Sequence, residues 1–277
     1  MSVWQADFYR RPLKTERGEP IWELLLCDAD GSLTYRQRCL QSQANPQWVA
    51  RQFQQFSEGQ LATTVQVFRP QCLGLIGEAA KQLGMAIEAT RRTYALKRLL
   101  LLLAREYPQE ANYTGEEYDP LAVDRPPPLP LPEKLWGDGW RFARIEAGDL
   151  VDTFADRPIP IVEMPDLLKP IHLGLSSTVT VPGVAIDGGK ASMQLARWLQ
   201  AARPVAIDYR GGEFGGLVLE AGLNDRAILA TFDDPEAIAC ARRFEQRKQE
   251  AGGLHFLLVQ PDDTGRTYSG FWLLQAA

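Results

Sequence analysis

Long apolar runs are missing from this sequence of 277 residues. The longest extends over six residues, from Leu99 to Ala104, whereas a membrane-spanning helix needs about 20. The first residues, MSVWQADFYRR, contain no apolar signal-peptide core and do not resemble a transit peptide. We therefore expect no membrane insertion. We expect a cytoplasmic protein that stays in the compartment where it is made.

Clusters of metal-binding residues are also missing. The four cysteines show no C-x-x-C spacing, and the two histidines, His172 and His255, are far apart in the sequence. We therefore expect reduced thiols, no structural metal and no cofactor. His255 alternates with apolar residues in GGLHFLLVQ, a pattern more typical of a structural histidine in a strand than of a catalytic base.

The common signatures of nucleotide binding and of nucleophilic hydrolysis are incomplete. In VPGVAIDGGKAS, a phosphate-binding loop would need glycine at the position of Val184 and a hydroxyl residue at that of Ala191. No G-x-S-x-G motif is present. A nuclease would need carboxylates that converge on divalent ions, and sequence spacing cannot show convergence. Two sets of residues could supply them, namely Asp7, Asp28 and Glu78, or Asp187, Asp208 and Glu220.

Charge is unevenly distributed along the chain, whose net charge is -5. Residues 1–107 contain 14 Lys and Arg against 10 Asp and Glu, residues 108–134 contain 2 against 6, and residues 135–277 contain 14 against 19. The middle segment is rich in proline, which stiffens an extended chain. We therefore predict a basic α/β domain over 1–107, an acidic proline-rich linker over 108–134, and a C-terminal α/β domain over 135–277 that ends in a Phe-Trp-Leu-Leu strand.

Alternation of apolar residues and helical spacing predict mixed α/β sheets in both domains. In the first domain, three strands (WQADFYRR, PIWELLLCD and LTYRQRC) precede a helix that begins at Asn45-Pro46. Strand, helix, strand and helix follow. This succession matches that of ribonuclease H-like domains, and the match is an analogy of fold that carries no activity.

Arginines beside aromatic residues recur in the first domain. They include Arg10 and Arg11 after Phe8-Tyr9, and Arg91 and Arg92 before Thr93-Tyr94. Single-stranded RNA is bound by such combinations, because arginines contact phosphates while rings stack on bases. Solvated strand faces explain the same residues equally well.

Six segments resemble the Tab-type translation activators of cyanobacteria and chloroplasts: WQADFYRRP, PIWELLLCD, VFRPQC, ATRRTY, GGLHFLLVQ and GFWLL. These are A/U-rich RNA-binding proteins needed to synthesise the PsaB subunit of photosystem I, with relatives linked to photosystem II. The resemblance implies a non-enzymatic protein that binds A/U-rich single-stranded mRNA leaders and promotes translation or assembly of photosystem subunits. Ribosomes or assembly factors would be further partners, in the cyanobacterial cytosol or, for a processed form, the chloroplast stroma.

Family members end in a Trp-Leu-Leu tripeptide to which RNA binding has been attributed. It corresponds here to Trp272, Leu273 and Leu274, and we expect Phe271, His255 and the four arginines named above to belong to the same function. Either Trp272 stacks on bases, or it is a core residue whose loss unfolds the binding domain. A protein-interaction scaffold without specific RNA affinity and a divalent-metal nuclease are the alternative functions.

Overall fold

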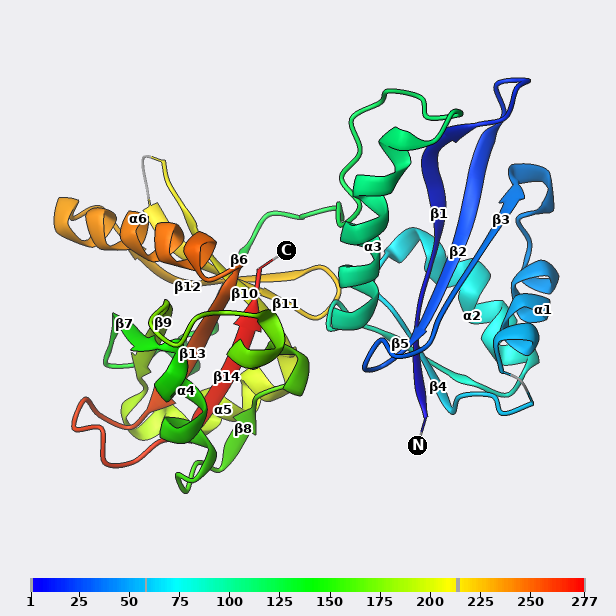
Figure 1. Ribbon diagram of the computed structural model, residues 1–277. Helices are drawn as coiled ribbons and strands as arrows, with labels where there is room; N and C mark the ends of the chain where they lie inside the picture. Colours follow the sequence, from blue (N-terminus) through cyan, green and yellow to red (C-terminus); the bar gives the residue numbers. More distant parts are fainter. Residues whose placement is uncertain (1, 58, 213–214, 277) are drawn as a thin grey trace. The chain divides into compact units, whose positions relative to one another are not determined.

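The computed structural model describes residues 2–57, 59–212 and 215–276, and the chain forms two compact units, Met1–Asp124 and Arg125–Ala277 (Figure 1). Each unit is a mixed α/β domain, which confirms the predicted fold class. The division falls between Asp124 and Arg125, inside the segment expected to be a linker.

Five described strands of the first unit form one sheet, in the order β3-β2-β1-β4-β5. β1 is antiparallel to β2 and parallel to β4, and β4 is parallel to β5. This arrangement agrees with the ribonuclease H-like topology expected from the element order. The bounds are β1 Val3–Lys14, β2 Pro20–Asp28, β3 Thr34–Leu40, β4 Thr64–Val67, β5 Ala86–Ala89, α1 Pro46–Ser57, α2 Leu73–Gln82 and α3 Tyr94–Glu106, with 3₁₀ turns η1 Gln41–Gln43, η2 Pro70–Cys72 and η3 Tyr107–Gln109.

Alternation along β2 divides the first unit's core between the two faces of the sheet. Leu24 and Leu26 pack with Val49 and Phe53 of α1, whereas α3 contacts β1 and β2 from the other face (Figure 1). α1 begins as the sequence predicts, because the Trp48 amide donates to the Asn45 side chain and Pro46 occupies the first helical position.

The two parts of segment 108–134 belong to different units, residues 108–124 to the first and residues 125–134 to the second. Its first part adds a bridge between Leu13 and Tyr113, and Arg69 donates hydrogen bonds to the carbonyls of Pro120 and Ala122. Its last part contains β6 (Leu129–Pro130), a short strand of the second unit. This segment therefore combines short 3₁₀ turns with irregular stretches whose backbone carbonyls accept hydrogen bonds from the units.

The second unit contains two sheets in its described residues, with strand orders β10-β11-β12-β6 and β7-β9-β13-β14-β8. Their apolar faces share one core, which includes Val184, Ile207, Leu217 and Leu257. The remaining bounds are β7 Gly139–Glu146, β8 Ile161–Glu163, β9 Thr180–Asp187, β10 Pro204–Arg210, β11 Gly215–Ala221, β12 Asp225–Phe232, β13 Leu254–Gln260, β14 Gly270–Gln275, α4 Ala147–Ala155, α5 Ser192–Ala202 and α6 Pro235–Glu250, with η4 Glu133–Leu135, η5 Asp166–Leu168, η6 Pro170–Leu173 and η7 Gly189–Ala191.

Candidate nucleic-acid interface

The terminal aromatic segment lies inside the second unit. β14 pairs with β13 on one side and with β8 on the other, and Phe271, Trp272, Leu273 and Leu274 are all buried. The Phe271 ring stacks on Phe154 of α4, with centroids 4.0 Å apart. Trp272 and Leu274 belong to the core that α5 covers. Both faces of this strand are therefore covered, and its alternation reflects two buried surfaces rather than one buried and one solvated.

The Trp272 ring needs the glycine two residues before it. A Cβ atom added to Gly270 would lie 2.3 Å from Cη2 of the indole, far inside van der Waals contact. Gly270 and Trp272 lie on the same face of the strand, so the small residue makes room for the large one. Part of the G-F-W-L-L pattern is thus explained by packing alone.

His255 is also buried, on the neighbouring strand β13. Its Nε2 accepts a hydrogen bond from the Ile207 amide at 2.8 Å, and its Nδ1–H donates to the Gly253 carbonyl at 2.8 Å. Burial, together with the nearby Lys248 ammonium, lowers the pKa of His255 to about 3. A neutral imidazole therefore joins two strands, and its ring nitrogens are both engaged within the protein.

Arg11 lies in a buried network of charges instead of on the surface. Its guanidinium donates to the Asp7 carboxylate at 2.8 Å and to the Tyr118 hydroxyl at 2.9 Å, and it is 3.4 Å from Glu23. Arg69 binds the other oxygen of Asp7 at 3.0 Å. Burial opposes ionisation of Asp7, yet Arg11 and Arg69 together keep its pKa below the usual value. The network is internally neutralised.

The carboxylates considered for a nuclease do not come together in the first unit. Asp7 is held by two guanidinium groups, Asp28 accepts hydrogen bonds within the turn that follows β2, and Glu78 is exposed on α2. Within residues 2–57, 59–212 and 215–276, no group of three or more His, Cys, Asp or Glu side chains is arranged to hold a metal ion.

The other predicted arginines differ in exposure. Arg10 is exposed on β1, Arg91 is buried, and Arg92 is half-buried after β5. The nine residues expected to bind RNA therefore belong to both units, and most of them are buried.

Acidic residues of segment 108–124 offset much of the first unit's positive charge. Glu110 pairs with both Arg36 and Arg38, and Glu116 lies 3.4 Å from Lys14. Adding the five acidic residues of this segment to the 10 of residues 1–107 gives the first unit 15 Asp and Glu against 14 Lys and Arg. The basic character expected from the first 107 residues is lost in the folded unit.

A chain of four half-buried aromatic rings lies on the second unit. Phe232 of β12 is between Tyr209 of β10, with centroids 5.9 Å apart, and Trp140 of β7, at 5.1 Å. Trp140 in turn contacts Phe142 at 5.4 Å. We call these four residues the aromatic row. Half-buried rings are held in place by the core and still present an edge or face to a ligand.

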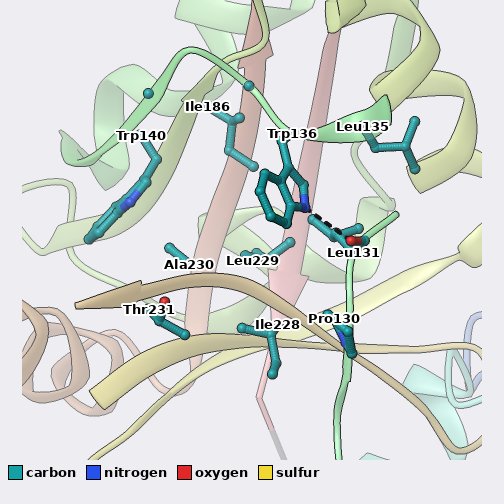
Figure 2. Close-up of a pocket in the computed structure, with 12 residues that line it drawn as sticks. Pro130, Leu131, Leu135, Trp136, Trp140, Ile186, Ile228, Leu229, Ala230 and Thr231 are labelled. Carbon is teal, nitrogen blue, oxygen red and sulfur yellow. Dashed lines mark hydrogen bonds between the residues drawn. The ribbon is translucent and has the colours of Figure 1, made fainter. Parts of the chain in front are cut away.

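Trp140, an inner member of the aromatic row, also lines a hollow of about 350 Å³ (Figure 2). Trp136 and Trp140 stand on either side of it, with Ile186 between them. The residue Trp136 is 61% exposed, and its indole Nε1–H donates to the Leu131 carbonyl at 3.0 Å, which fixes the ring. An exposed, oriented indole beside an apolar hollow suits the face of a planar ligand.

Backbone groups also reach this hollow. β6 pairs with only Ala227 and Ile228 of β12, and the next residues, 229–231, line the hollow with no strand beside them on that edge within the described residues. Such an edge carries amide donors and carbonyl acceptors that can hydrogen-bond a ligand. Sequence reasoning missed this site. The alternation of Trp140 and Phe142 was visible in WGDGWRF, but their neighbours come from strands that lie some 70 to 90 residues later.

Comparison with known proteins agrees with the resemblance seen in the sequence. Residues 3–102 match the model of the RNA-binding protein Tab2/Atab2 N-terminal domain, and residues 118–275 match that of its C-terminal domain. A relative named Protein TAB2 homolog, chloroplastic, from Zea mays is 30% identical over 279 residues, covering 98% of this chain and 70% of the relative. The protein of the same name from Arabidopsis thaliana is 28% identical, covering 99% and 74%.

Solved structures show only a weak likeness. The HTLV-2 integrase catalytic core domain in complex with magnesium covers 39% of this chain and 72% of its own, with 10% identity and a TM-score of 0.28. The BIV integrase catalytic core domain covers 40% and 75%, with 16% identity and a TM-score of 0.27. Scores this low carry no argument about fold or activity. No helix within the described residues is long and apolar enough to cross a membrane. On the two domain matches and the relatives that span nearly its whole length, this chain belongs to the Tab2/Atab2 family of RNA-binding proteins.

Proposed function

We propose that this protein binds A/U-rich single-stranded RNA through the aromatic row and the Trp136 hollow of its second unit. Binding there is non-enzymatic and brings the leader of a photosystem mRNA to the translation machinery, or to factors that assemble the subunit. The site of action is the cyanobacterial cytosol or the chloroplast stroma. Of these two places, the relatives' printed names, which call them chloroplastic, support the stroma.

The observation that carries this proposal is the exposure of Trp136. The residue is 61% exposed, and its fixed indole lines the same hollow as Trp140, one of the half-buried rings in contact with one another. Successive bases of a single strand stack on such rings. Replacing one stacking ring by alanine lowers the binding free energy by about 1–3 kcal/mol for each base that loses its contact. The unpaired edge of β12 adds donors and acceptors for base edges.

The residues predicted from the sequence take other roles in this proposal. Trp272, Leu273, Leu274, Phe271 and His255 hold together the sheet of which β7 is the edge strand, and they therefore support the aromatic row without contacting RNA. Arg10 and Arg92 remain candidates for additional phosphate contacts from the first unit, and Arg11 and Arg91 support their surroundings from within.

Binding of a short fluorescent A/U-rich strand, measured by anisotropy against a G/C-rich control strand, tests the proposal. We expect preferential binding of the A/U-rich strand and about a 5- to 150-fold loss for Trp136→Ala, the equivalent of one lost stacking contact. Ile171→Ala is the matched control, because Ile171 is an exposed apolar residue of the same unit that does not line the hollow. Unchanged binding by Trp136→Ala would refute the site.

A protein-docking function is the second candidate, and a specific observation favours it. Leu129 of β6 is 70% exposed and directly precedes Pro130, which lines the hollow together with the exposed Trp136. Exposed apolar residues next to an apolar hollow are typical of a protein-docking surface. If the wild-type protein binds neither strand at moderate salt, this scaffold role replaces RNA binding.

A further inference from the structure

We propose that a groove between β7 and α6 binds backbone phosphates of single-stranded RNA. Its lining includes Arg144 of β7 and Arg243 and Arg247 of α6, and its volume is about 290 Å³. This proposal rests on the proposed function, because it places the phosphates of the same strand whose bases stack on the aromatic row.

The periodicity of two elements brings the three arginines together. On α6, Cys240, Arg243, Phe244 and Arg247 have the i, i+3, i+4, i+7 spacing of one helix face, and all four line the groove. On β7, Arg144 continues the side of the strand that carries Trp140 and Phe142. One helix face and one strand face therefore supply all three cations to a single concave surface.

The charge of the groove is not neutralised from within. Its lining contains three arginines and no Asp or Glu. Among the described residues none of the three makes an ion pair, and the one polar side-chain contact of Arg243 is a hydrogen bond to Cys240 Sγ at 3.0 Å. Other arginines of the unit do have carboxylate partners, such as Arg141 with Asp187 and Arg226 with Glu220. Unpaired guanidinium groups that share a concave surface are ready to bind anions bidentately.

The groove continues the aromatic row. Phe142 belongs to both, and its ring lies 5.6 Å from that of Phe244 in the groove wall. Arg144 is four residues along β7 from Trp140, a distance of about 13 Å in an extended strand. Bases on the row and phosphates in the groove can thus come from neighbouring nucleotides of one strand, whereas a free anion would use the groove alone.

The salt dependence of RNA binding gives the direct test. For single strands, log K falls with log salt by about 0.7 per neutralised phosphate, so the double variant Arg243→Gln/Arg247→Gln should flatten the slope by about 1.4. Over the tenfold range from 1 M to 0.1 M salt, the wild type should therefore gain about 25-fold more affinity than the double variant. Arg242→Gln is the matched control, since Arg242 is exposed on the same helix and does not line the groove. The salt slope of Arg242→Gln should differ from that of the wild type by less than half of the 0.7 expected for the loss of one groove arginine.

Cys240 provides a readout without any substitution. It is half-buried in the groove, whereas Cys27, Cys39 and Cys72 are buried, so a thiol reagent should label it first. We expect the A/U-rich strand to slow iodoacetamide labelling of Cys240, and equimolar inorganic phosphate to leave it unchanged. Equal protection by phosphate would assign the groove to free anions and overturn the RNA assignment.

The outcomes separate the two proposals. If wild-type protein binds RNA and Trp136→Ala weakens it while the double variant keeps the wild-type salt slope, the phosphate groove is wrong and the proposed function stands. If the wild-type protein binds no RNA, the proposed function fails and the groove proposal fails with it.

Discussion

Substituting Trp272 tests whether the terminal strand supports the RNA site or forms it. The indole is fully buried in the core that α5 covers, and a buried aromatic side chain removes about 150–250 Å² from water. At about 25 cal/mol per Å² this area corresponds to about 4–6 kcal/mol, part of which alanine retains. Trp272→Ala should therefore lower the free energy of unfolding by about 3–5 kcal/mol, the usual cost of replacing a buried tryptophan by alanine. A loss of this size is a large part of the stability of a typical domain, about 5–15 kcal/mol.

Trp272→Phe separates stability from contact. Phenylalanine keeps most of the buried ring, and within the described residues the indole Nε1–H has no hydrogen-bond partner to lose. We therefore expect a smaller loss, about 1–2 kcal/mol, from the reduced volume alone.

Urea unfolding followed by circular dichroism gives the stabilities, and anisotropy titrations in the absence of urea give the RNA affinities. The Phe variant should bind RNA as the wild type does, and the Ala variant should lose binding only in proportion to its unfolded fraction. A Phe variant that melts like the wild type and has lost affinity at least tenfold would refute a purely structural role for Trp272.

Two further predictions concern buried ionisable groups. The pKa of His255 in the folded protein, about 3, is below its usual value of 6.5, so between these values the unfolded chain binds a proton that the folded protein does not, and stability should fall as pH falls through this window. For one such group the loss between pH 6.5 and pH 5 is about 2 kcal/mol, measurable by urea unfolding at several pH values; a flat profile over that range would contradict the neutral buried imidazole. Asp7→Asn leaves the buried Arg69 without its charge partner and should cost about 3–5 kcal/mol in the same assay. Glu117→Gln, at an exposed position, should change the unfolding free energy by less than about 0.5 kcal/mol, and equal effects of the two substitutions would show that the buried network does not stabilise the unit.

Much of the fold follows from local patterns in the sequence. Asn45-Pro46 predicts where α1 begins, and alternating apolar residues predict β1, β2 and β14, because caps and strand faces depend on neighbouring residues only. The linker illustrates what local patterns omit. Its prolines predict a stiff, extended chain, whereas its contacts with Arg69 and Arg38 join residues far apart in the sequence.

The candidate site depends on such distant contacts almost entirely. Arginine-aromatic pairs near Arg11 look like RNA-binding residues, yet Asp7 and Glu23 draw that guanidinium into the interior. Conversely, nothing adjacent in sequence links Trp140 to Phe232, and Arg144 gains its neighbours from a helix about 100 residues later. Charge and aromatic content indicate the class of ligand, whereas only the folded sheets show which residues can reach it.

Photo-crosslinking of a 4-thiouridine-containing A/U-rich strand, followed by mass spectrometry of the attached peptides, tests the location of the RNA site most directly. We expect crosslinks in residues 136–144 of the exposed hollow and β7, and in residues 229–232 of β12. Crosslinks concentrated on Phe271, Trp272 or His255, with none in β7 or β12, would contradict the proposed interface and return the terminal strand to the RNA-binding surface.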